Sequence, residues 1–298
     1  MRRAMTLLFA AIPLVIAVLL LVQIAASHFP SRQARADDVP RGPRATLVMS
    51  MAPPGSAGNP GWRSGDGLWV DVPLARRGSS YLRVDQALAA GRMPPVEAVR
   101  TEELVNGFRY ADPPGGGAAF AVHAEVGPAP WNPRHRLVRL VIHSGTLSRD
   151  AAATLAFDAV QAYRLIGFEG PPGRHGLAPI EVTPSELLPG ETVTALFEIV
   201  PRPGQRRLFT LYAHGEDVAV TRAVDDPFVA LADTSDDFRF AAAVAGFGML
   251  LRRSPHRGDL DWKDVRALAA GALGTDADHA RQRFVTVVDR AAEVAALP

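Results

Sequence analysis

Apolar positions divide the chain into an unbroken N-terminal run, a centre that alternates with a period of two, and a C-terminal part with helical spacing. In the centre, Phe120 to Val126 alternates, Pro128 to Pro133 forms a turn, and Leu137 to Ile142 is rich in branched aliphatics, which predicts a β-hairpin. Further strands are predicted at Leu68 to Val72, Thr154 to Phe157, Tyr163 to Phe168, Val193 to Val200 and Leu208 to Tyr212. Because a single hairpin is marginally stable, we expect one antiparallel sheet or sandwich.

Helical patterns lie on both sides of these strands. Ser79 or Ser80 is expected to cap a helix that runs to about Ala90, and a second helix is predicted from Pro95 to Phe108. Three C-terminal helices are predicted at Phe238 to Leu251, Trp262 to Ala270 and Ala280 to Ala296, with Asp259 capping the second and Thr275 or Asp276 the third. Their aromatic side chains are expected to pack the helices on one another or on the sheet: Phe238, Phe240, Phe247, Trp262 and Phe284. The predicted fold class is therefore α+β, with two short helices, a central antiparallel sheet or sandwich and a C-terminal three-helix subdomain.

The N-terminal run predicts a membrane helix. Ala4 to Ser27 carries no charge and follows Arg2 and Arg3, and about twenty helical residues span a bilayer core of roughly 30 Å. This length favours a retained single-pass anchor in a bacterial inner membrane, with the bulk of the chain outside the cytoplasm. The alternatives are a signal cleaved near Ala36, which gives a secreted or periplasmic protein, and a buried core helix. Residues His28 to Gly67, rich in Pro, Gly, Ser and Arg, are predicted to form a flexible tether.

Composition excludes several classes of function. Among the 298 residues the formal net charge is +1, so no polyanion-binding surface of the nucleic-acid kind is indicated. The absence of cysteine excludes disulfides, thiolate metal sites and cysteine nucleophiles. No Gly-x-Ser-x-Gly, Gly-Lys-Ser/Thr or His-Glu-x-x-His motif occurs. We therefore expect no enzymatic activity and no cofactor.

Three stretches resemble bacterial envelope proteins of the YfbK type, which carry a von Willebrand factor type A domain between an N-terminal and a C-terminal flanking region. The N-terminal likeness includes Gly91-Arg92-Met93-Pro94-Pro95, Phe120-Ala121-Val122-His123 and Trp131-Asn132-Pro133; the C-terminal one includes Tyr163-Arg164-Leu165-Ile166-Gly167, Thr192-Val193-Thr194-Ala195-Leu196 and Asp237-Phe238-Arg239-Phe240. After the anchor or signal at residues 1–27 and the tether at 28–67, the resemblance implies the N-terminal flanking region at 68–143 and the C-terminal one at 144–298. The latter is expected to be β-rich over 152–222 and helical over 235–298.

The type A domain itself is expected to be missing. In the family it is a doubly wound sheet with an Asp-x-Ser-x-Ser metal loop, inserted between strands equivalent to Leu137 to His143 and Thr154 to Phe157. Here only a short connection joins them, and a hairpin connection would keep the ends of a lost insert close together. Asp233-Thr234-Ser235-Asp236-Asp237 mimics the loop loosely but is better explained as the start of a helix. The resemblance therefore implies the frame of the family without its metal site.

Few side chains suggest a site. His123 and His143 on the hairpin lack a third ligand, so ordinary histidines are favoured over zinc ligands. The candidate partner contacts are Trp131, Arg206, Arg207, Arg252 and Arg253, although Trp131 is more consistent with folding back onto the sheet. We expect an exported, membrane-tethered, non-enzymatic binding or scaffold protein whose partner is an envelope protein, such as a separate type A-domain protein. The alternatives are a periplasmic hydrolase with an unrecognised site and a truncated remnant.

Overall fold

The computed structural model describes residues 62, 69–71, 80–111, 120–145, 148–157, 160–167, 185–215 and 218–297. The predicted membrane helix Ala4 to Ser27 and, apart from Trp62, the tether lie outside these residues. Of the helices that the structure describes, none combines the length and the apolar character that crossing a bilayer requires.

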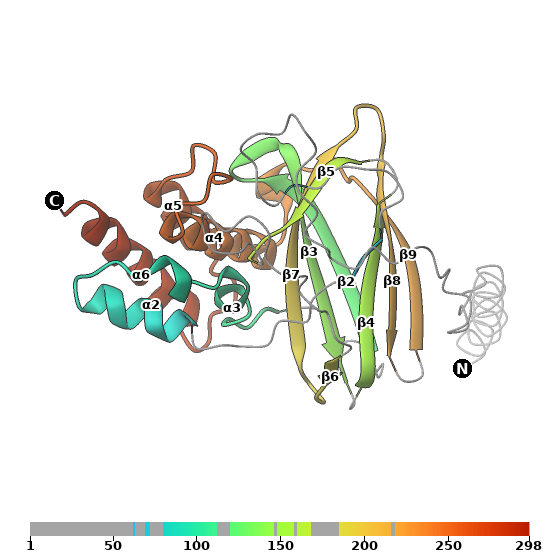
Figure 1. Cartoon of the computed structure of the whole chain (residues 1–298), viewed down its shortest axis with the longest axis horizontal. Helices are drawn as coiled ribbons and strands as arrows, with labels where there is room; N and C mark the ends of the chain where they lie inside the picture. The colour runs from blue at the N-terminus through green and yellow to red at the C-terminus, as the bar shows by residue number, and fades with distance from the viewer. Residues whose placement is uncertain are drawn as a thin grey trace, which may run out of the picture. The chain divides into compact units, whose positions relative to one another are not determined.

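Two antiparallel sheets form the centre of the described residues, as Figure 1 shows. The first sheet, in the order β2-β3-β7-β5, contains β2 (Phe120–Ala129), β3 (Asn132–Ser144), β7 (Thr192–Pro201) and β5 (Val160–Leu165). The second sheet has the order β1-β4-β8-β9 and contains β1 (Trp69–Asp71), β4 (Ser148–Phe157), β8 (Arg207–Gly215) and β9 (Val218–Asp225), with β6 (Ser185–Leu187) paired to β4. The expected sandwich and the β2–β3 hairpin are thus confirmed. The sequence analysis missed β6 and β9.

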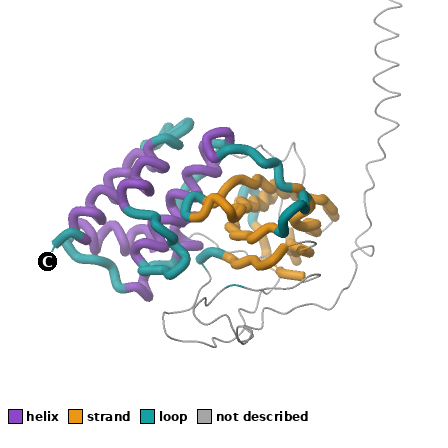
Figure 2. Tube along the Cα trace, turned by 90° about the horizontal axis from the view of Figure 1, so that it is seen from above, coloured by secondary structure: helices purple, strands orange, loops and turns teal. Residues whose placement is uncertain are grey.

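A layer of helices covers one face of the first sheet. It consists of α2 (Ser80–Ala89), the 3-10 turn η2 (Val96–Ala98), α3 (Thr101–Val105), α4 (Asp236–Leu251), α5 (Trp262–Ala270) and α6 (Ala280–Ala295), with η3 (Leu231–Asp233) leading into α4. Figure 2 shows these helices gathered on one side of the strands. The α+β class and the C-terminal helices are therefore confirmed.

The first sheet is buried on both of its faces. Its inner face packs on the second sheet through residues such as Val138, Leu140 and Phe197, which belong to the sandwich core. A second core lies between the sheet and the helices, where Phe108, Phe240, Phe247 and Phe284 meet edge to face at centroid distances of 5.0–5.4 Å. Since successive strand residues point to opposite faces, β2, β3 and β7 supply residues to both cores.

The predicted helix from Pro95 to Phe108 is wrong, because the structure breaks it into η2 and α3. Val99 and Arg100, between the two, have extended backbone. Ser80 causes the break: its hydroxyl donates to the Ala98 carbonyl at 2.9 Å and accepts from the Arg100 N–H at 3.0 Å. Hydrogen bonds with Ser80 of α2 thus take the place of the backbone hydrogen bonds that a continuous helix would form here.

The predicted caps of the last two helices are displaced. Asp261, not Asp259, caps α5, in a capping box with Asp264. At α6 the N-cap position is His279, in the left-handed region with φ 54° and without a side-chain cap. Asp276 nevertheless accepts the N–H groups of Arg281 and Gln282, and these backbone hydrogen bonds outweigh desolvation and lower the pKa of its carboxyl. Asp276 therefore caps the helix from outside it.

The connection at the expected insertion point joins the two sheets. β3 ends at Ser144 in the first sheet and β4 begins at Ser148 in the second, so the two strands do not pair as a hairpin, although only three residues separate them. Residue 143, the expected boundary between the two flanking regions, lies near the end of β3. Elements before and after this residue combine in the first sheet and in the helical layer.

Glycine allows two close approaches that hold the layers together. A Cβ on Gly127 of β2 would lie 2.6 Å from the Thr234 Cγ2, and a Cβ on Gly248 of α4 would lie 2.6 Å from the Thr101 Oγ1. Gly127 thus brings β2 against the start of α4, and Gly248 lets α4 contact α3.

Candidate partner-binding surface

Charged side chains are buried on the helix-facing side of the first sheet. Arg139 of β3, Arg164 of β5 and Glu198 of β7 are each at most 1% exposed. They alternate along their strands with the apolar residues of the sandwich core, as a period of two requires. A buried charge is tolerated only where it is paired and hydrogen-bonded, so the contacts of these groups decide their role.

Glu198 is the centre of a buried polar cluster. Its Oε1 lies 2.5 Å from the Nδ1 of His135, and its Oε2 accepts from the Nε of Arg164 at 2.7 Å. The other end of Arg164 reaches helix α4, where its Nη2 lies 3.4 Å from the sulfur of Met249. Burial alone would raise the pKa of the Glu198 carboxyl, but His135, Arg164 and the Trp131 indole together lower it. The cluster therefore favours the ionised carboxylate.

Aromatic rings close over this cluster. The Trp62 ring lies edge to face with His135 at a centroid distance of 5.3 Å and with His256 at 6.2 Å, and the Arg164 guanidinium is 5.8 Å from the same ring. Trp131 is 6% exposed, so its predicted folding back is confirmed. Its buried indole nitrogen makes no hydrogen bond of normal geometry, although the indole contributes to the low pKa of Glu198.

A second polar cluster joins the sheet to α4 and α6. Arg281 of α6 pairs with Asp237 of α4 and donates to the Ala272 carbonyl at 3.1 Å. The guanidinium groups of Arg139 and Arg281 lie 4.4 Å and 5.6 Å from the ring of Tyr110, between the sheet and the helices. The charges of both clusters are thus used in holding the layers together.

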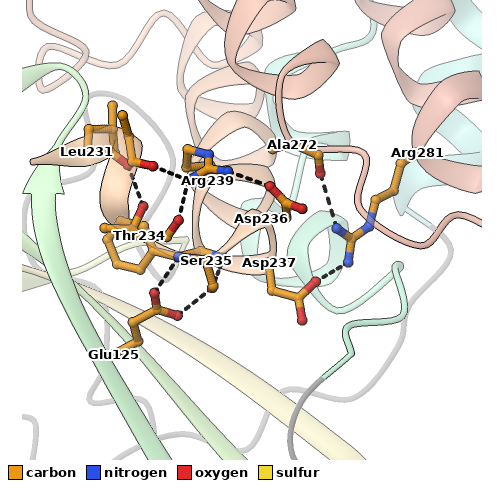
Figure 3. Close-up of polar contacts among 11 residues, drawn as sticks. Glu125, Leu231, Thr234, Ser235, Asp236, Asp237, Arg239, Ala272 and Arg281 are labelled. Atoms are coloured by element: carbon orange, nitrogen blue, oxygen red, sulfur yellow. Dashed lines mark hydrogen bonds and ion pairs between the residues drawn. The ribbon is translucent and has the colours of Figure 1, made fainter.

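The acidic run before α4 begins a helix, as Figure 3 shows. Ser235 is the N-cap and accepts from the Phe238 N–H at 3.0 Å, and its own N–H and hydroxyl donate to Glu125 of β2. Asp236 pairs with Arg239, and Asp237 with Arg281. The interpretation of this run as a helix start is confirmed. In the part of the chain that the structure describes, no group of three or more histidine or acidic side chains is placed to hold a metal ion.

An open groove lies next to this cap, between β2 and β9. Its volume is about 350 Å³, and it is lined by His123, Ala124, Glu125, Val126, Arg222, Ala223, Val224, Asp225, Pro227, Val229, Asp233 and Thr234. β2 and β9 are the outermost strands of their respective sheets among the described residues. The groove is therefore bordered by two strand edges.

Phe228 stands at the lip of the groove, between the lining residues Pro227 and Val229. Its side chain is 59% exposed and its backbone has φ 52°, an uncommon conformation for a large residue. The guanidinium groups of Arg206 and Arg136 lie 5.5 Å and 5.9 Å from its ring. Its N–H donates to the buried Asp226, which pairs with Arg136 at 2.7 Å. Phe228 is thus held outward by its surroundings.

The structure gives the predicted partner contacts different settings. Arg206 is exposed and lies over Phe228, while Arg207 is paired with Asp225. Arg252 donates to the Val99 carbonyl at 2.7 Å, which links α4 to the segment before α3. Arg253 is exposed, with φ 52°. Trp131 and Arg252 therefore have internal roles, and contact of any of these five residues with a partner stays a prediction.

The histidines His123 and His143 lie on neighbouring strands, as expected, but in different settings. In the register of the hairpin, His123 is opposite Val141 and His143 is opposite Ala121. His143 is 3.0 Å from the Thr192 hydroxyl, whereas His123 lines the groove. Among the residues that the structure describes, neither histidine belongs to a group of three possible metal ligands.

Sequence reasoning missed Phe228 and the cluster around Glu198. The run Asp225-Asp226-Pro227-Phe228 carries a turn signal with one aromatic, and β9 before it has the alternation Val218, Val220, Val224. These signals were available but weak. Nothing in the sequence pairs Arg164 with Glu198 across 34 residues.

Two family models match this chain. The model described as "Uncharacterized protein YfbK, C-terminal" matches residues 209–294, and the model described as "von Willebrand factor" matches residues 70–139. The uncharacterized protein YfbK of Escherichia coli (strain K12) is 37% identical over 71 residues, which make up 21% of this chain and 12% of that protein. The absence of a type A domain stays a prediction, although every strand pairing in the described residues is antiparallel.

Proposed function

We propose that this chain, which matches the YfbK C-terminal model over residues 209–294 and the von Willebrand factor model over residues 70–139, is an exported, membrane-tethered protein without catalytic activity that binds another protein. The observation that carries the binding role is Phe228, an exposed aromatic in a strained conformation between two arginines. Such strain persists only where the surrounding structure holds it, and it gathers at functional sites. Aromatic and arginine side chains also supply much of the binding energy at protein interfaces.

Membrane anchoring is part of the proposal because the uncharged run Ala4 to Ser27 follows two arginines. The test is fractionation of bacteria that make the full-length protein, followed by alkaline washing of the membranes and protease treatment of intact spheroplasts. A retained anchor leaves the protein in washed membranes and accessible to protease. A shortened soluble protein starting near Asp37 would instead show a cleaved signal, and protection from protease would contradict export.

The partner in this proposal is an envelope protein, such as a separate type A-domain protein. The matched regions, residues 70–139 and 209–294, lie on both sides of residue 143, where the resemblance implies that the family carries its insert. This position favours a frame that acts together with a type A domain on another chain. Mild cross-linking in native membranes followed by mass spectrometry tests it. We expect an envelope protein whose recovery falls when Phe228 is replaced, and recovery of this chain alone would contradict the proposal.

The absence of catalysis is proposed because the histidine and acidic side chains around Glu198 are bonded to one another and lie beneath aromatic rings. Profiling the purified protein with ester, glycoside and peptide substrates tests this. We expect no turnover above background. Robust turnover that is abolished by His135→Ala would identify a hydrolase and overturn the proposal.

A further inference from the structure

The groove between β2 and β9 runs along the edges of two strands. Residues 123–126 of β2 and 222–225 of β9 line it consecutively. Since alternate residues of a strand point to opposite faces, a cavity on one face would be lined by every second residue. Consecutive lining residues place the cavity beside the backbone. An edge strand presents N–H and C=O groups that pair readily with another extended chain.

The two sides of the groove differ, and the difference indicates which strand an added segment would pair with. On the β2 side, Glu125 is already held by the N–H and hydroxyl of Ser235 at the start of α4. On the β9 side, the strand continues directly into Pro227, Phe228 and Val229 at the lip. An added strand along β9 would therefore end against the exposed aromatic ring, where its side chains gain apolar contact.

The charges at the groove favour an acidic occupant. Two of its carboxylates have internal partners: Glu125 at Ser235, and Asp225 at Arg207. Arg222 in the lining and Arg206 at the lip make no ion pair with a described residue, and of the three acidic lining residues only Asp233 lacks such an internal partner among the described residues. Arginine is enriched at interfaces and forms bidentate hydrogen bonds with carboxylates.

We propose that the groove binds an extended, acidic segment of a partner protein, which adds as a strand to the edge of β9 and packs an apolar side chain on Phe228. Main-chain hydrogen bonds supply affinity in this mode, and alternate side chains supply specificity. Arg222 and Arg206 select carboxylates on the segment. This inference rests on the protein-binding function proposed above and specifies its partner.

The experiment uses the full-length protein in mild detergent and a dye-labelled peptide of alternating valine and glutamate, about eight residues long as in a typical strand. Fluorescence anisotropy measures its binding. One control peptide has lysine for glutamate, and another has the same side chains but methylated alternate backbone nitrogens. We expect the acidic peptide to bind at least about tenfold more tightly than the lysine peptide, and methylation to abolish binding because it removes main-chain donors.

Variants of the protein locate the binding. Arg222→Glu should reverse the preference between the acidic and the lysine peptide, and its control is Arg92→Glu, which changes an exposed arginine outside the groove. Phe228→Asn should weaken binding about tenfold or more, since asparagine tolerates the left-handed backbone but lacks the ring. Its control is Leu82→Ala, which truncates an apolar side chain that is 57% exposed on α2.

Each other outcome has its own meaning. Equal binding of methylated and unmethylated peptides, or no effect of Arg222→Glu, overturns strand addition. Failure of the peptides to bind, while cross-linking still recovers an envelope protein that depends on Phe228, overturns the groove proposal and leaves the binding function standing. Binding to vesicles of anionic phosphatidylglycerol but to no peptide would assign the surface to the membrane. Loss of both cross-linking and peptide binding overturns the two proposals together.

Discussion

The two faces of the first sheet use the same strands in different ways. The inner face joins the second sheet through a core of hydrophobic side chains, such as Val138, Leu140 and Phe197. The outer face joins the helices through apolar contacts and, in addition, through buried charges such as Arg164 and Glu198. Apolar packing is strong but has no direction, whereas paired charges are costly to separate and allow few geometries. We infer that the outer face sets the orientation of the helical layer on the sheet.

The largest effect is expected from breaking one pair on the outer face. Arg164→Leu leaves the Glu198 carboxylate buried beside His135 without its arginine partner, which should cost about 3–5 kcal/mol in the free energy of unfolding. Urea unfolding followed by tryptophan fluorescence measures it.

The double variant Arg164→Leu with Glu198→Leu separates charge from packing. Replacing a buried ion pair by apolar residues is often neutral or stabilising, so the double variant should recover most of the loss. If it stays as unstable as Arg164→Leu alone, the loss comes from packing, and the two faces of the sheet differ less than their chemistry suggests.

Truncation on the inner face should cost slightly less. Leu140 is fully buried in the sandwich core, and Leu140→Ala should lower the free energy of unfolding by about 2–5 kcal/mol through lost apolar contacts and a cavity. Leu140→Met, which conserves volume, should cost less than about 1.5 kcal/mol. A cost for Leu140→Ala that varies strongly with pH would contradict a purely apolar inner face.

The inner face was the part of the sheet that sequence patterns predicted well. The alternation at Phe120 to Val126 and the aliphatic run at Leu137 to Ile142 identify strands with one apolar face. The outer face was not predictable, because Arg139 and Glu198 occupy alternate positions that look the same whether helices or water cover them. The break at Val99 was also hidden, since it depends on Ser80, which lies 20 residues before the Arg100 that it binds.

The candidate site was predicted only in part, for a similar reason. Arg206 and Arg207 were noticeable as a pair, but the sequence could not show that Arg207 is paired with Asp225 while Arg206 lies over Phe228. The groove forms because the edges of two sheets converge, and the residues that line it are separated by about half of the folded chain. Local periodicity carries no information on such contacts.

The layer between the first sheet and the helices should also respond to pH, with opposite signs at Glu198 of β7 and Glu102 of α3. Burial raises the pKa of Glu102 above its ordinary 4.5, whereas the pKa of Glu198 is lowered, since its polar partners outweigh burial. For Glu198 the unfolded state takes up the proton first, so its stabilising contribution is complete above pH 4.5 and is lost as the pH falls below it. For Glu102 the unfolded state ionises first, so stability falls as the pH rises above 4.5.

Unfolding measured between about pH 3 and 6 tests these signs. Relative to the parent, Glu198→Gln should become less stable as the pH rises, and Glu102→Gln should become more stable. Parallel curves for the two variants would show that the two carboxylates do not differ in environment. Leu140→Ala serves as the control, because an apolar substitution on the inner face should keep a constant offset.

The smallest effect is expected where the outer face meets solvent. Ser235 is exposed, caps α4 through the Phe238 N–H and donates to Glu125 of β2. Ser235→Ala removes both contacts and should cost about 1 kcal/mol, and Ser235→Asn, which keeps a capping oxygen, should recover most of it. Urea unfolding resolves this difference when all variants are measured together. A loss of stability for Ser235→Ala as large as that for Arg164→Leu would contradict this expectation. It would mean that polar contacts stabilise the outer face whether or not they are buried. The contrast between the two faces would then depend on hydrogen bonding rather than on the removal of charge from water.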